Sequence, residues 1–117
     1  MTESTILGST HPFDIAAARA RLANGGYEIV HQSQGVEVGV YVLVAPEPDR
    51  QQPHEDDEVY VVLEGTGTLE IEDRSVDLHV GNAVFVPAGA EHRFVGYEQL
   101  AVLVIFDKRV AQPNVNT

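Results

Sequence analysis

The sequence predicts an all-β domain of antiparallel strands, forming a sandwich or a barrel, with one short helix near the N-terminus. Short stretches rich in β-branched residues follow one another from Tyr27 onward. Turn-forming residues separate them at hairpin spacing, as at Gly65-Thr66-Gly67 and Asp73-Arg74. Many short strands joined by turns that contain Gly or Pro are typical of sandwiches and barrels.

We expect the helix first and the strands after it. Asp14 can cap a helix that runs through Leu22, because the stretch between them is rich in Ala, and Asn24-Gly25-Gly26 ends it. About eight strands follow, in the ranges 27–32, 36–45, 57–64, 67–73, 75–80, 82–87, 91–97 and 99–106. The chain therefore divides into an N-terminal segment with a short helix (1–26), a β-barrel domain (27–110) and a polar C-terminal tail (111–117).

Composition excludes several classes of function. The chain has 117 residues, enough for one domain, and its 18 acidic against 7 basic residues give a net charge of -11. Such a chain lacks the basic face that nucleic acid or an anionic membrane requires. It has no Cys, which excludes disulfides and thiolate chemistry and suits the reducing cytoplasm where we expect the protein. The longest apolar run, Leu100 to Phe106, is far shorter than the roughly 20 residues of a membrane helix, so we interpret it as a buried strand.

Two stretches carry candidate metal ligands. Side chains alternate along a strand, so Glu58 shares a face with Tyr60 and Val62, and His92 shares a face with Phe94. The apolar members predict that both faces point inward. A buried carboxylate or imidazole is costly unless it is paired or bound to a metal. Two imidazoles and one carboxylate form the ligand set of open non-haem Fe(II) sites, and other metals accept the same set.

Each residue taken alone has a simpler interpretation. His54 lies in an acidic loop, where most histidines are solvated, and Glu58 can be a surface carboxylate at the start of a strand. His92 can cap the turn that follows Gly89. The spacing of the residues as a set decides between these readings and a metal site.

That spacing resembles the two motifs of the cupin superfamily. Three residues separate His54 from Glu58 and six separate Glu58 from Gly65, as in the first motif, which opens with two His one residue apart. The second motif is Gly, five residues, Pro, one residue, Gly, two residues and His. Its fixed positions are all matched, by Gly81, Pro87, Gly89 and His92. The resemblance covers about residues 36–106 and implies an antiparallel jelly-roll β-barrel.

Three positions depart from the motifs. Gln52 stands where the leading His is expected, Pro46 replaces the opening Gly, and Gly96 replaces the closing Asn. The last two affect turns. Gln52 concerns the centre of the site, because an amide oxygen is a neutral and harder ligand than an imidazole. Gln52 can bind the metal, bind substrate or only occupy the space.

The resemblance implies one divalent metal ion, Fe, Mn, Ni, Zn or Cu, inside the barrel. His54, Glu58 and His92 are its expected ligands, with Gln52 as a weak fourth ligand or a near neighbour. Tyr60 and Phe94 are expected at the substrate pocket.

The resemblance also implies a function. Cupin enzymes of dioxygenase, isomerase or lyase type act on small polar metabolites, and the alternative is a non-catalytic cupin that binds or senses a small ligand. We expect a homodimer, with Leu100 to Phe106 or the segment before Val36 at the contact. The other histidines match no motif position and are expected at the surface or at strand edges: His11, His31 and His79.

Overall fold

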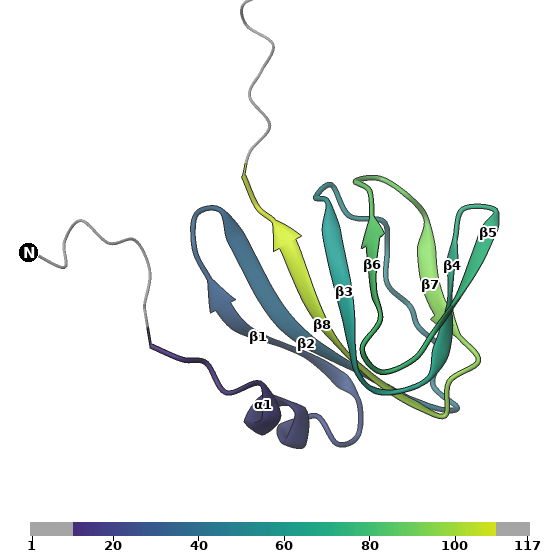
Figure 1. The fold of residues 1–117 in the computed structure, drawn as a ribbon, viewed down its shortest axis with the longest axis horizontal. Helices are drawn as coiled ribbons and strands as arrows, with labels where there is room; N and C mark the ends of the chain where they lie inside the picture. Colours follow the sequence, from purple (N-terminus) through teal and green to yellow (C-terminus); the bar gives the residue numbers. More distant parts are fainter. Residues whose placement is uncertain (1–10, 110–117) are drawn as a thin grey trace, which may run out of the picture.

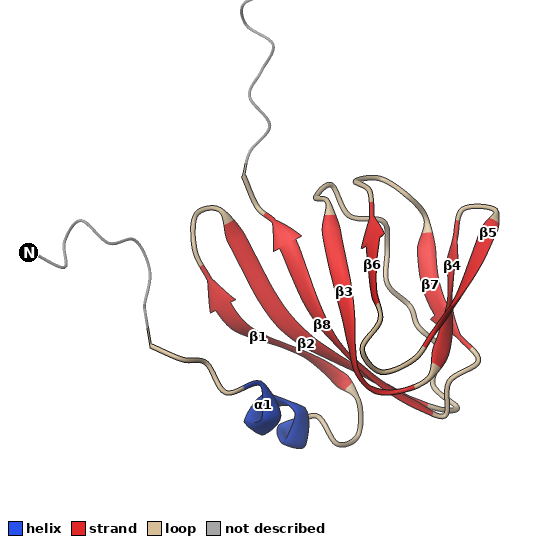
Figure 2. Ribbon diagram, in the orientation of Figure 1, coloured by secondary structure: helices blue, strands red, loops and turns tan. Residues whose placement is uncertain are grey.

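The computed structural model of the protein describes residues 11–109, which form one short helix and eight strands (Figures 1 and 2). In chain order these are α1 (Ile15–Arg21), β1 (Gly26–Gln32), β2 (Val36–Val44), β3 (Glu58–Gly65), β4 (Gly67–Ile71), β5 (Arg74–Leu78), β6 (Ala83–Val86), β7 (His92–Val95) and β8 (Gln99–Asp107). The predicted all-β architecture with a short N-terminal helix is confirmed. The predicted domain limits beyond this range lie outside the described residues.

The strands form two antiparallel sheets. One sheet has five strands in the order β1-β2-β8-β3-β6, and the other has three in the order β5-β4-β7. The chain passes from β3 to β4, from β5 to β6 and from β6 to β7 between the two sheets, and it returns through β8 to lie between β2 and β3. This crossing of consecutive strands between two sheets is typical of a jelly roll.

Helix α1 begins and packs as its sequence predicts. The Asp14 side chain accepts a hydrogen bond from the backbone N–H of Ala17 at 2.9 Å, which is the N-cap interaction. Ala18 is fully buried in a small cluster with Val40 and Val42 of β2 and Ala101 of β8. The helix therefore covers part of one face of the five-stranded sheet (Figure 2).

The main core lies between the sheets and follows strand alternation. Tyr60 and Val62 of β3 are buried with Leu69 of β4, Phe94 of β7 and Val104 of β8. Burial of each such side chain contributes about 1.5–3 kcal/mol. The same alternation buries Glu58, which lies two residues before Tyr60, as the sequence predicts.

One turn lies one residue earlier than expected. Glu72 and Asp73 form the turn between β4 and β5, with Glu72 at φ 51°, whereas the sequence analysis placed the turn at Asp73-Arg74 and ended the strand at Asp73.

The strand order bears on where a dimer contact could lie. β8 is hydrogen-bonded to β2 on one side and to β3 on the other, so Leu100 to Phe106 offers no free edge for a dimer. Among the described strands, β1 lies at the edge of the larger sheet, within the segment before Val36. The homodimer itself stays a prediction.

Candidate metal centre

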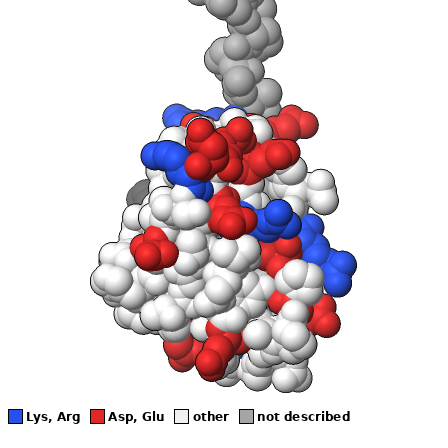
Figure 3. All heavy atoms as spheres, turned by 90° about the vertical axis from the view of Figure 1, so that its right-hand side faces the viewer, with Lys and Arg blue, Asp and Glu red and all other residues white. Residues whose placement is uncertain are grey.

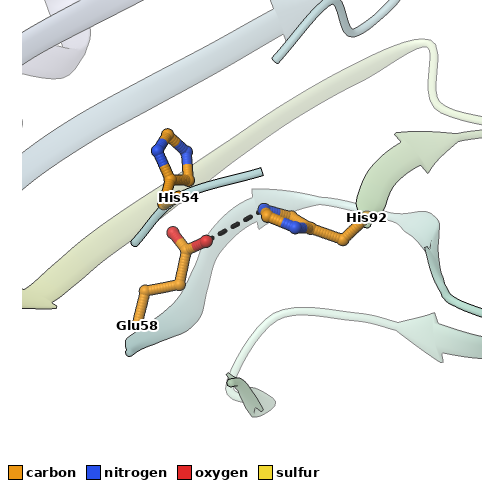
Figure 4. A group of neighbouring side chains, drawn as sticks. All are labelled: His54, Glu58 and His92. Carbon is orange, nitrogen blue, oxygen red and sulfur yellow. Dashed lines mark ion pairs between the residues drawn. The ribbon is translucent and has the colours of Figure 1, made fainter. Parts of the chain in front are cut away.

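Three side chains from separate parts of the chain meet at one end of the β3 strand (Figure 4). Glu58 is the first residue of β3, His92 is the first residue of β7, and His54 lies in the loop that precedes β3. One potential ligand atom from each residue lies within 4.8 Å of the other two. Glu58 is 1% exposed and His92 is 7% exposed, whereas His54 is half-buried. The structure therefore brings together the three residues that the motif spacing singled out.

Backbone contacts connect the two motifs. The N–H of Gly89 donates to the carbonyl of His54 at 2.7 Å, and the N–H of Ala88 donates to the Asp57 carboxylate at 2.8 Å. Gly89 has φ +82°, a conformation that glycine adopts without strain. The turn before His92 and the loop that carries His54 are thereby held against each other, which places both imidazoles beside Glu58.

The hydrogen bonds of His92 define which nitrogen faces the site. Nδ1 lies 2.8 Å from the carbonyl of Ala90, so it carries the proton, and Nε2 points at Oε1 of Glu58 from 2.9 Å. Burial lowers the pKa of His92, but hydrogen bonding to Glu58 and Ala90 and the charge of Glu58 outweigh it, so the net pKa is raised. An imidazole anchored through Nδ1 to a carbonyl is the usual arrangement of a metal ligand.

The Glu58 carboxylate fits a metal ion on its own evidence. Both of its oxygens are buried, and neither has a hydrogen-bond partner among the described residues apart from the ion-pair contact of Oε1 with Nε2 of His92 at 2.9 Å. A carboxylate buried with a single partner is costly, and a divalent cation between it and the imidazoles satisfies all three groups. The residues present therefore fit the metal that the motifs imply.

Gln51, and not the expected Gln52, lies beside the three candidate ligands. Gln52 is exposed and does not line the cavity beside Glu58, whereas Gln51 does. The Gln51 amide oxygen lies 3.1 Å from Nε2 of His92 and accepts a hydrogen bond from the Tyr60 hydroxyl at 2.9 Å. Residues 48–54 have no regular secondary structure, so neither strand alternation nor motif spacing determines which glutamine turns inward.

Asp49 is a buried carboxylate beside the site that the sequence analysis did not single out. It is 6% exposed, and its carboxylate accepts hydrogen bonds from four donors. These are the Tyr41 hydroxyl at 2.6 Å, the Gln51 side-chain amide at 2.6 Å, the Phe94 N–H at 2.8 Å and the Gln51 N–H at 3.3 Å. The bond to the N–H two residues ahead is a local Asp preference, and it is the one signal in the sequence that pointed to this residue.

A cavity of about 290 Å³ opens beside the three candidate ligands. Its lining residues are Tyr27, Glu37, Tyr41, Gln51, His54, Asp56, Glu58, Tyr60, Val104, Phe106 and Lys108. Tyr60 lies at this cavity, as expected. Phe94 is not among the lining residues, because it is buried in the core, where its ring packs against the Tyr60 ring at 4.8 Å.

Polar side chains of the cavity wall are paired with one another. The Tyr27 hydroxyl donates to Glu37 at 2.8 Å, and Lys108 forms an ion pair with Asp56 at 2.9 Å. Burial first, and then the neighbouring carboxylates, raise the pKa values of Tyr27 and Tyr41 far above the ordinary tyrosine value. Both hydroxyls therefore stay protonated, with their protons directed at carboxylates.

The remaining histidines do not line the cavity beside this centre. His79 and His11 are exposed, and His31 on the edge strand β1 stacks on Phe13 with ring centroids 5.4 Å apart. On the face shown in Figure 3, acidic side chains gather in larger patches than basic ones, in line with the net charge of -11. The described part of the chain contains no helix long and apolar enough to cross a membrane.

Residues 40–106 match the cupin domain family. The chain belongs to the cupin superfamily. The match includes the loop, strands and turn that carry His54, Glu58 and His92. The predicted resemblance is confirmed, and with it the jelly-roll fold class.

Three similar proteins illustrate the range of this superfamily. An uncharacterized protein of Streptomyces coelicolor is 39% identical to this cupin over 88 residues, which cover 74% of this chain and 84% of that protein. An acireductone dioxygenase of a Sulfurihydrogenibium species is 49% identical over 49 residues, which cover 38% of this chain and only 27% of that enzyme. A cupin superfamily protein of Desulfitobacterium hafniense has a TM-score of 0.69 and 22% identity, covering 86% of this chain and 94% of that one, and this likeness shows the fold alone.

Proposed function

We propose that this cupin is a divalent-metal-dependent enzyme that acts on a small polar metabolite. The observation that carries the proposal is the buried Glu58 carboxylate, which has no partner besides the His92 imidazole and lies between two imidazoles beside a cavity. A protein that needed only a stable core would gain from an apolar residue at this position. A cation at a cavity wall is useful where a substrate has to reach it.

The cavity supports a small substrate with several hydroxyl groups. Its volume of about 290 Å³ lies just below the usual range for ligand pockets, which is roughly 300–1,000 Å³, so only a small ligand fits. The protons of Tyr27 and Tyr41 are committed to Glu37 and Asp49, so each hydroxyl oxygen offers a lone pair to a ligand. The wall therefore favours groups that donate hydrogen bonds, such as substrate hydroxyls.

The residues of the site would have different roles in the reaction. His54, Glu58 and His92 would hold the metal ion, which supplies a Lewis acid for substrate oxygens and, if it is redox-active, the capacity to activate O2. Burial and the Glu58 charge raise the pKa of Tyr60, so its hydroxyl stays a hydrogen-bond donor. Among dioxygenase, isomerase and lyase chemistry we place dioxygenation first, because the partial relative with a named activity is an acireductone dioxygenase.

Reconstitution of the metal-free protein tests this function. The protein is loaded anaerobically with Fe²⁺, Mn²⁺, Ni²⁺, Zn²⁺ or Cu²⁺ and mixed with enediols, hydroxyketones and diketones. O2 uptake is followed with an electrode, and isomerised or cleaved products are followed by NMR. We expect turnover that depends on the metal and is lost in Glu58→Gln. Full turnover by the metal-free protein would contradict the proposal.

The alternative is a non-catalytic cupin that binds a small ligand. The same experiment separates the two. A compound that raises the melting temperature of the metal-loaded protein but is recovered unchanged supports the binding function.

A further inference from the structure

We propose that Gln51 is the fourth ligand of this metal and that Asp49 aims its amide oxygen at the ion. The site then consists of two imidazoles, one carboxylate and one amide oxygen. The inference rests on the proposed function only in requiring a divalent metal at this place, and it does not depend on which reaction is catalysed.

Asp49 determines which end of the Gln51 amide faces inward. All the groups around the Asp49 carboxylate are donors, so it acts as an acceptor, and the Gln51 side chain has to turn its NH2 group toward it, 2.6 Å away. The amide oxygen is then left on the opposite side, beside Tyr60 and His92. The orientation of the amide follows from its hydrogen bonds.

The atoms on the inner side have more lone pairs than protons. The Gln51 oxygen lies 3.1 Å from Nε2 of His92, and that nitrogen lies 2.9 Å from a Glu58 oxygen. His92 directs its Nδ1 proton to Ala90, its Nε2 also lies 3.1 Å from the Tyr60 hydroxyl, and the single proton of Tyr60 goes to the Gln51 oxygen. Without metal, a proton on Nε2 of His92 can bridge to Glu58, and a divalent cation would take the place of that proton.

The observed separations also suit a metal ion. Adjacent ligands of an octahedral ion with bonds of about 2.1 Å lie about 3.0 Å apart. The Gln51 to His92 and Glu58 to His92 distances of 3.1 and 2.9 Å lie on either side of that value. The Gln51 oxygen therefore lies close enough to His92 to share a metal ion with it.

Asp49 can act as a positioning residue because it is itself fixed. It accepts from the hydroxyl of Tyr41 on β2 and from the backbone N–H of Phe94 on β7, the strand that also carries His92. The loop that carries Gln51 is therefore tied to a ligand-bearing strand through one buried carboxylate.

The first test compares Gln51 with its neighbour. Affinities of the metal-free protein for Co²⁺ and Mn²⁺ are measured by competition with a chromophoric chelator, together with the visible spectrum of bound Co²⁺. We expect Gln51→Met, which keeps the volume and removes the oxygen donor, to weaken binding by roughly 10–100-fold and to change the Co²⁺ spectrum. The matched control Gln52→Met should change neither. Equal behaviour of the two variants would overturn the assignment.

The second test compares two substitutions of Asp49. Asp49→Ala removes the acceptor that holds the Gln51 NH2 group, so the amide is free to turn, and we expect weaker metal binding and an altered Co²⁺ spectrum. Asp49→Asn can keep its oxygen toward the N–H groups of Gln51 and Phe94 while its own NH2 group faces the Tyr41 hydroxyl, which can accept. We expect this variant to keep nearly wild-type affinity and spectrum, and equal loss in both variants, or no loss in Asp49→Ala, would overturn the role of Asp49.

Folding and metal failures are separable in these tests. Circular dichroism establishes that each variant is folded, and if Asp49→Ala is not, the comparison of Gln51→Met with Gln52→Met still decides on the ligand. A wild-type protein that binds none of the metals would overturn the metal-dependent function and this inference together. A wild-type protein that binds metal while Gln51→Met has no effect would overturn this inference alone.

Discussion

The candidate ligands on strands and those on the loop before β3 are held in different ways. Glu58 and His92 are each the first residue of a strand, and the strand ladders fix the direction of their side chains. Gln51 and His54 lie in a stretch without regular structure. Gln51 is held by two hydrogen bonds to Asp49, and the backbone carbonyl of His54 accepts one from Gly89. The strand pair is almost fully buried and the loop pair is half-buried. A strand defines a ligand by its position in the ladder, whereas a loop needs a dedicated partner for each ligand.

The largest loss of metal binding should come from substitution of Glu58, one of the two candidate ligands on strands. Glu58→Gln removes the only charged group among the candidate ligands, so we expect metal binding to fall by more than the roughly 10–100-fold cost of losing a supporting residue. Metal content of the purified and reloaded variant measures the effect. A variant that keeps its metal would show that Glu58 is no ligand.

The next largest loss of metal binding should come from the two histidines, and it should differ between them. Both His92→Ala and His54→Ala should lose most of the metal, and the loss should be greater for His92. Its ring is anchored to Ala90 and buried, so little side-chain entropy opposes binding, whereas half-buried His54 has more freedom to lose. Titration with Co²⁺ measures the ratio. A greater loss from His54→Ala would reverse the comparison of strand and loop.

A smaller but measurable effect is expected on folding. Asp49→Ala leaves the buried N–H of Phe94 and the hydroxyl of Tyr41 without their acceptor. An unsatisfied buried polar group costs about 1–3 kcal/mol, so we expect the free energy of unfolding of the metal-free protein to fall by about 2–5 kcal/mol. Urea denaturation measures it. A change below about 0.5 kcal/mol would mean that the loop is held by other contacts.

Substitution of two polar residues outside the site should change neither metal affinity nor stability. Gln52 and His79 are exposed and do not line the cavity, so Gln52→Ala and His79→Ala should leave metal affinity and stability within experimental error. The same titrations and urea denaturation provide the measurement. Loss of metal in Gln52→Ala would restore the interpretation that motif spacing alone suggested.

The strands and the residues on them could be predicted well from the sequence, because the alternation of side chains along a strand is a local rule. The eight strands, the Asp14 cap and the inward side chains of Glu58 and His92 all follow from periodicity and turn residues. Gly96 in place of the expected Asn is also explained, since its φ of +69° is a left-handed conformation that both residues adopt.

The loop that carries Asp49, Gln51 and His54 was less predictable from the sequence. The inward turn of Gln51 depends on a hydrogen bond to Asp49, and Asp49 is fixed by Tyr41 and Phe94, which lie on strands distant in sequence. No pattern within residues 48–54 encodes those contacts. They arise only when the two sheets are packed together.

The most direct test of the central claim is a crystal structure of protein purified without chelator and supplied with Fe²⁺, Mn²⁺, Ni²⁺, Zn²⁺ or Cu²⁺. Data are collected at the absorption edge of each metal. We predict one anomalous peak, bonded to the imidazoles of His54 and His92 and to the carboxylate of Glu58. The absence of a peak with every metal, or a peak elsewhere with His92 still in contact with Glu58, would contradict the account.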